Sequence, residues 1–139
     1  MITNADITIY NTWWDPVTRS SKYMRTQIEG VHWYTDQKTN VGDKGLVSAD
    51  LYKIRIPADA VIQDGRTYVD PIKYKILTTD EVPKYWTLGK GDLFVKGLIT
   101  ADVEKISDLT LAYSNVGRVN SVSDNRQGLN PHIRVGGAS

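Results

Sequence analysis

The sequence predicts a mainly β protein, a small β-barrel or β-sandwich of antiparallel strands with one short helix. Apolar residues recur at every second position in most segments, which is the period of a half-buried strand. Pro, Gly, Asn and Asp interrupt these segments at short intervals, as turns between strands do. The chain has 139 residues, an ordinary length for one folded unit, so we expect a single domain spanning 1–139.

Two strands are predicted in the first third of the chain. Ile7 and Ile9 alternate with polar neighbours, and Asp15 followed by proline ends this strand. A longer β-prone run covers 23–35, and Gly30 inside it indicates a bulge or a bend. The polar segment 36–45 then predicts a loop, either mobile or ordered by a partner.

Two later segments share one alternating pattern, in which apolar residues face one side and cations the other. The apolar sets are Tyr52, Ile54 and Ile56 in 51–57, and Ile72, Tyr74 and Ile76 in 71–76. The cations between them are Lys53 and Arg55 in the first segment, and Lys73 and Lys75 in the second. With an Asp64-Gly65 hairpin signal between the segments, both are predicted to be strands.

The last third combines strands with the single predicted helix. Residues 92–100 predict a central strand, bent at Gly97, because both of its faces are apolar. Residues 103–112 predict the helix, since apolar residues recur there at three to four positions and Asp102 stands at the N-cap. A final hairpin joins 116–122 to 132–135, and 136–139 is expected to be a loose tail.

Composition and motifs exclude several kinds of chemistry. There is no Cys, so disulfides, thiolate catalysis and Cys-based zinc sites are excluded. The two histidines, His32 and His132, have no partners at catalytic spacing, and the Gly-Lys-Gly segment at 89–91 lacks the spacing of a phosphate-binding loop. We therefore expect no catalytic residues, no cofactor and no metal, and predict that the protein is not an enzyme.

The four cations indicate a partner if their two strands are neighbours. Like charges opposite each other are unfavourable, so Lys53, Arg55, Lys73 and Lys75 would need acids, an acidic subunit or nucleic-acid phosphates nearby. A solvated face is the alternative. Because the net charge is only +1, we expect a subunit contact rather than DNA binding.

Two aromatic doublets are the other candidate interface residues. Neighbouring residues of a strand point to opposite faces, so one ring of Trp13-Trp14 and one of Trp33-Tyr34 can enter the core while the other lies outward. An outward ring would serve as an anchor in a subunit interface or as a platform for a sugar. Burial of both rings of a doublet by a bend or loop is the alternative.

Several short blocks of the chain together resemble a family of small phage and prophage proteins of Gram-positive hosts. The blocks are 6–11, 30–33, 54–57, 85–88, 91–92, 95–97 and 122–126, together with His132. Members of this family look like head-tail joining, or head-closure, proteins in length and β-rich pattern. Similar chains usually carry an aromatic residue after the histidine, where this chain has Ile133.

The resemblance implies a non-enzymatic virion structural protein, a head-tail connector of the neck. Its partners would be other copies of itself in a ring, the portal or adaptor, and tail proteins, with DNA in the lumen as a further candidate. The alternative is a tail or baseplate accessory module that binds a carbohydrate or a receptor. We expect no targeting or membrane-spanning segment. The resemblance implies assembly in the bacterial cytoplasm and residence in the virion.

Overall fold

The computed structural model describes residues 3–35, 52–105, 107–113, 115–127 and 129–138. The fold is mainly β, as predicted. Its strands are β1 (Ala5–Asp15), β2 (Ser20–Thr35), β3 (Tyr52–Pro57), β4 (Val61–Ile62), β5 (Thr67–Tyr68), β6 (Tyr85–Trp86), β7 (Leu93–Lys96), β8 (Val116–Asn125) and β9 (His132–Ala138). The helices are α1 (Pro71–Lys75), α2 (Ser107–Thr110) and two 3-10 turns, η1 (Gln63–Gly65) and η2 (Val82–Lys84). The predicted loop 36–45 lies outside the described residues.

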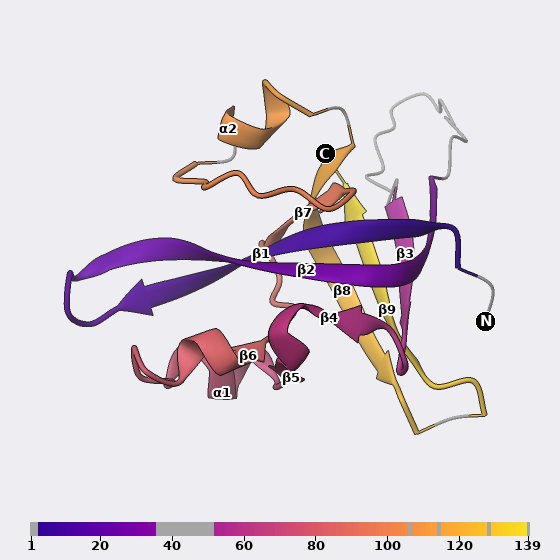
Figure 1. The fold of residues 1–139 in the computed structure, drawn as a ribbon, viewed down its shortest axis with the longest axis horizontal. Helices are drawn as coiled ribbons and strands as arrows, with labels where there is room; N and C mark the ends of the chain where they lie inside the picture. The colour runs from indigo at the N-terminus through magenta and orange to yellow at the C-terminus, as the bar shows by residue number, and fades with distance from the viewer. Residues whose placement is uncertain (1–2, 36–51, 106, 114, 128, 139) are drawn as a thin grey trace, which may run out of the picture.

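Six of the strands pair in a closed circuit. The order is β1-β7-β8-β9-β3-β2, and β2 pairs back onto β1, so that the sheet forms a small barrel (Figure 1). Every neighbouring pair in this circuit is antiparallel. Because β7 lies between β1 and β8, the predicted central strand is confirmed over Leu93–Lys96, but it ends before Gly97, whose φ is +104°, and does not continue to residue 100. The predicted final hairpin is confirmed as β8 and β9.

The long strand β2 pairs first with β1 and then with β3. Its first part pairs with β1 as far as Val31, and its last residues, from His32 onward, pair with β3. Gly30 lies at the change, with a φ of +86° that favours glycine, and its N–H donates to the Asp6 carboxylate at 3.0 Å. The predicted bend is therefore real, and it is what allows one strand to belong to two parts of the sheet.

Phe94 occupies the centre of the barrel core. It is fully buried and makes edge-on contacts with the rings of Trp33 and Tyr52, each with a centroid distance of 5.6 Å. A Cβ on Gly117 or on Gly137 would lie 2.5 Å from a carbon of the Phe94 ring. The segment 136–139 was expected to be a loose tail, yet residues 136–138 belong to β9, because this glycine-lined strand admits the Phe94 ring.

Three other sequence predictions are wrong or only partly right. Residues 71–75 form a helix, because the Asp70 carboxylate caps the N–H groups of Ile72 and Lys73 and a proline follows at the first helical position. The Asp64-Gly65 segment is the turn η1, and the strands on either side of it, β4 and β5, pair elsewhere.

The predicted helix 103–112 is real only over the four residues of α2. Asp102 does not cap it. The Asp108 carboxylate instead accepts the N–H groups of Glu104 and Lys105, which keeps this part of the chain in a turn. Val103 and Leu109 are buried together, as their spacing predicted. No helix in the described part of the chain has the length and apolar content to span a bilayer.

Candidate functional site

One end of the β1–β2 hairpin leaves the barrel as a two-stranded ribbon. The pairing of β1 with β7 ends at Tyr10, so residues 11–15 of β1 and 20–24 of β2 pair only with each other. We call these residues, together with the turn 16–19 that joins them, the ribbon. Figure 1 shows it projecting beyond the barrel, with α1 beneath it and the segment before α2 above it.

The lower face of the ribbon is held by α1 and η2. Trp13 is 3% exposed and packs with Tyr74 of α1 and Val82 of η2, and Met24 adds to the same cluster. A two-stranded hairpin alone is marginally stable in water. Helix α1, which was predicted to be a strand, therefore supports the ribbon.

A buried carboxylate fixes the base of the ribbon on the β1 side. Asp92 is 5% exposed and accepts the Thr12 N–H at 3.1 Å, the Asn11 amide at 2.8 Å and the Gly89 N–H at 2.8 Å. Burial raises the pKa of Asp92, although these donors act in the opposite direction. Sequence reasoning missed this residue, since the glycines around it indicated only a turn before a strand.

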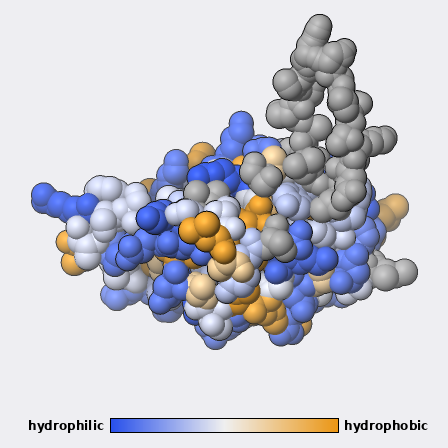
Figure 2. Space-filling model, turned by 90° about the horizontal axis from the view of Figure 1, so that it is seen from above, coloured by the Kyte–Doolittle hydropathy of each residue, from blue (hydrophilic) through white to orange (hydrophobic). Residues whose placement is uncertain are grey.

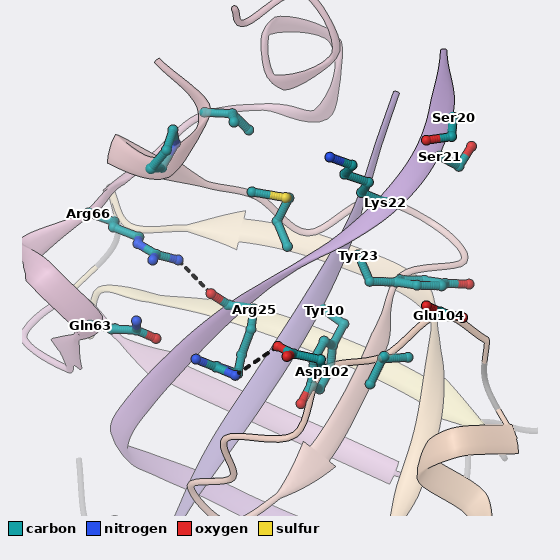
Figure 3. Close-up of a pocket in the computed structure, with 14 residues that line it drawn as sticks. Tyr10, Ser20, Ser21, Lys22, Tyr23, Arg25, Gln63, Arg66, Asp102 and Glu104 are labelled. Carbon is teal, nitrogen blue, oxygen red and sulfur yellow. Dashed lines mark hydrogen bonds and ion pairs between the residues drawn. The ribbon is translucent and has the colours of Figure 1, made fainter. Parts of the chain in front are cut away.

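Two side chains fix the base on the β2 side. The side-chain amide oxygen of Gln63 accepts the backbone N–H of Gln27 at 3.0 Å, and the Arg66 guanidinium donates to the backbone carbonyl of Arg25 at 2.6 Å. Figure 3 shows this edge, with the side chain of Arg25 turned towards Asp102, to which it forms an ion pair at 3.6 Å. The edge of β2 here borders a hollow of about 650 Å³.

The tip of the ribbon combines an ion pair with exposed apolar side chains. The Lys22 ammonium lies 2.7 Å from the Asp15 carboxylate, which also accepts the Val17 N–H. These two contacts lower the pKa of Asp15 to about 2. Val17 is 76% exposed and Trp14 is 56% exposed. In Figure 2 the ribbon is the left-hand end of the molecule, where hydrophobic and hydrophilic side chains lie together.

The aromatic doublets divide as the strand geometry predicted. Trp13 and Trp33 are buried, whereas Trp14 and Tyr34 are exposed. Trp14 borders a second hollow of about 530 Å³, which is also lined by Thr12, Ser21 and Asp92. The outward ring with the most open surroundings is therefore Trp14, on the ribbon.

The four predicted cations do not form one face. Lys73 and Lys75 belong to α1 beneath the ribbon, whereas Lys53 and Arg55 belong to β3 in the barrel (Figure 1). The prediction failed because it took 71–76 as a strand beside β3.

A different basic row exists on the barrel. Arg55 lies between His32 of β2 and Arg134 of β9 in the strand register. Lys53, two residues along β3, lies over the Tyr34 ring at 5.9 Å. We call Lys53, Arg55, Arg134 and His32 the basic row. Arg134 was missed because its neighbour in space is 79 positions away along the chain.

The two histidines lie on either side of β3, His32 opposite Arg55 and His132 opposite Pro57. His32 stacks at a tilt against Tyr34, with 5.5 Å between ring centroids, and His132 places Nδ1 2.6 Å from the Asn130 carbonyl. Within the described residues neither imidazole forms an ion pair, and no three His, Asp or Glu side chains gather as metal ligands.

Comparison with known proteins places the chain in a family. Residues 2–138 match the family model described as "Family of unknown function (DUF6751)", so the chain belongs to this family. Searches of curated proteins and of solved structures found no match.

Proposed function

We propose that this protein is a non-enzymatic virion structural protein of a phage or prophage, a head-tail connector that forms a ring between portal and tail. The observation that carries the proposal is the ribbon, which projects from a closed barrel and ends in exposed Trp14 and Val17. The sequence resemblance to head-tail joining proteins supports the same role.

The ribbon is better suited to assembly than to the stability of the barrel. The barrel closes without the ribbon, because the pairing of β1 with β7 ends at Tyr10 and the six-stranded circuit is complete before the ribbon begins. The ribbon instead needs support from α1 and from buried polar contacts. Tryptophan is enriched at the centres of protein interfaces, and the half-exposed Trp14 ring offers such an anchor to a neighbouring subunit.

The basic row supports a partner on the barrel as well. Arg55 and Arg134 are directly opposite on neighbouring strands, an arrangement that costs free energy. An acidic face of the next subunit would offset this cost, and so would DNA in the lumen of the ring. We favour the subunit, because a net charge of +1 gives the whole protein little attraction for polyanions.

The test is an in-frame deletion of the gene in the phage or induced prophage that carries it. A connector deletion should yield DNA-filled heads and free tails in electron micrographs, with infectivity restored by the gene in trans. A deletion lysate of complete, infectious particles would overturn the proposal.

The second candidate is a tail or baseplate accessory module that binds a carbohydrate. The observation that favours it is the hollow beside Trp14, which is lined by this aromatic residue together with Thr12, Ser21, Lys75 and Lys90. The same deletion separates the two roles, since loss of such a module would leave complete particles that fail to adsorb. Binding of the purified protein to a glycan array, lost in Trp14→Ala, would favour this second role.

A further inference from the structure

The ribbon has two outer edges, one on β1 and one on β2. Along each strand, the backbone N–H and carbonyl groups of successive residues point alternately to the other strand of the ribbon and away from it. The N–H of Thr12 and the N–H of Gln27 reach side chains outside the ribbon, so these residues turn their backbone outward. Because an antiparallel ladder alternates, Trp14 on β1 and Ser21 and Tyr23 on β2 also turn outward, and so does Arg25, which directly follows the ribbon on β2. Each edge of the ribbon is therefore a row of outward donors and acceptors.

Some of these outward groups are already satisfied within the chain. Asp92 holds the N–H of Thr12, and Arg66 holds the carbonyl of Arg25. Among the described residues, the Thr12 carbonyl and both backbone groups of Trp14 have no partner on the β1 edge. On the β2 edge the same holds for the Arg25 N–H and for both backbone groups of Tyr23 and of Ser21.

The unsatisfied groups of the two edges match best in one antiparallel register, in which the two groups already held by side chains also lie opposite each other. With Trp14 of one ribbon opposite Tyr23 of another, each N–H meets the other's carbonyl. Two residues along, the free N–H of Arg25 meets the free carbonyl of Thr12. The next bond in this register would join the Thr12 N–H to the Arg25 carbonyl. Asp92 already binds this N–H and Arg66 already binds this carbonyl, so the pairing between ribbons ends there.

We infer that copies of this chain assemble by pairing the β1 edge of one ribbon with the β2 edge of the next, with Trp14 opposite Tyr23. The inference rests on the proposed ring-forming function and names the surface through which the ring forms. The partner at each edge is a second copy of this chain, because the donors and acceptors of one edge match those of the other.

The direction of the strands suits a ring. The two edges of a hairpin run in opposite directions, so ribbons in the same orientation meet with antiparallel strands. Each added copy leaves one β1 edge and one β2 edge free at the ends of the array, so the contact is head-to-tail. Such an array closes into a ring when the rotation between neighbouring copies is suitable. Neighbouring strands twist by about 20–25°, which supplies such a rotation at every junction.

The surroundings leave room for this contact. The hollow of about 530 Å³ borders the β1 edge at Trp14, and the hollow of about 650 Å³ borders the β2 edge from Ser20 to Arg25. Residues directly opposite each other share a face of a sheet, so the Trp14 and Tyr23 rings would form an aromatic pair across the junction.

The first test compares Trp14→Pro with Trp14→Thr. Both variants lose the indole ring, but only proline loses the outward N–H, and neither removes a bond within the ribbon because this N–H points away from β2. We expect the self-association constant of Trp14→Pro, measured by sedimentation velocity, to be weaker than that of Trp14→Thr by at least about tenfold. Equal association by the two variants, with matching circular dichroism and melting temperature, would overturn the inference.

The second test uses the absence of cysteine in the chain. The double variant Trp14→Cys, Tyr23→Cys should form a ladder of disulfide-linked oligomers on a non-reducing gel. The matched control Trp14→Cys, Met24→Cys places the second thiol on the opposite face of β2 and should give little ladder. Equal ladders in both would indicate random collision and would overturn the inferred register.

These outcomes separate the inference from the proposed function. A wild-type ring seen by electron microscopy, with no effect of Trp14→Pro and no specific ladder, would overturn the ribbon junction alone. Complete and infectious particles in the gene deletion would overturn the connector role itself.

Discussion

The barrel and the ribbon are built from the same two strands, but they are stabilised in different ways. In the barrel, β1 and β2 each have a neighbour on both sides, and their apolar residues pack around Phe94. In the ribbon each strand has one neighbour, and stability comes from Trp13 against α1 and from the polar contacts of Asp92. The comparison shows that the chain extends a hairpin beyond its core and then adds separate supports for it.

This difference also separates the functions that we assign to the two regions. In the barrel, pairing within the closed circuit uses backbone groups of all six strands, so we expect partners to bind side chains such as those of the basic row. The ribbon offers backbone as well as side chains. We therefore expect core substitutions to change the stability of the whole chain, and ribbon substitutions to change assembly first.

The largest effect should come from the barrel core. Phe94→Ala removes a fully buried ring, and we expect the free energy of unfolding to fall by about 3–5 kcal/mol in urea denaturation. Ile72→Ala is the control, because Ile72 is 78% exposed and should change stability by less than about 0.5 kcal/mol. A Phe94→Ala loss below about 1 kcal/mol would contradict the assignment of this ring to the barrel centre.

A smaller effect is expected from the support of the ribbon base. Asp92→Ala leaves the Thr12 and Gly89 N–H groups without their acceptor, so unfolding should become easier by about 1–3 kcal/mol. Asp59→Ala, on an exposed carboxylate, is the matched control. Amide exchange at Thr12 should accelerate in Asp92→Ala more than exchange in β8, and uniform acceleration would mean that Asp92 stabilises the barrel instead.

The smallest effect should come from the ribbon tip, and it should depend on pH. The Lys22 contact holds the pKa of Asp15 at about 2, below its ordinary value of 3.8. The stabilisation is therefore complete above the ordinary pKa and is lost as pH falls through the folded value. The difference in unfolding free energy between the wild type and Asp15→Asn should shrink between pH 4 and pH 2, as measured by urea titrations. A constant difference over this range would contradict the ion pair.

The alternation of apolar residues was sufficient to predict β1, β2, β3 and the final hairpin. It failed at 71–76, where Ile72 and Ile76 suit a strand by spacing but face solvent on a helix. The signal that could have found this helix is local, an aspartate followed by proline at 70–71.

Other features depend on contacts that are distant in sequence. The carboxylate of Asp92 reaches the ribbon 80 residues away, and no spacing along the chain indicates such a contact. Gly137 was predicted to lie in a loose tail, whereas it packs against the Phe94 ring of β7, which leaves no room for a Cβ at this position. The position of Trp14 on an open edge likewise followed only from the structure, because the sequence indicated an outward ring but not where the barrel ends.

Hydrogen exchange of the single amides of the ribbon tests the role of the ribbon most directly. The N–H groups of Trp14 and Tyr23 point outward, so we predict that they exchange fast in the dilute monomer and are protected at least about tenfold in the assembled form. Amides of β7, inside the barrel, should be slow in both forms. If Trp14 and Tyr23 exchange equally fast in monomer and assembly, the ribbon is not the surface through which copies of this chain join.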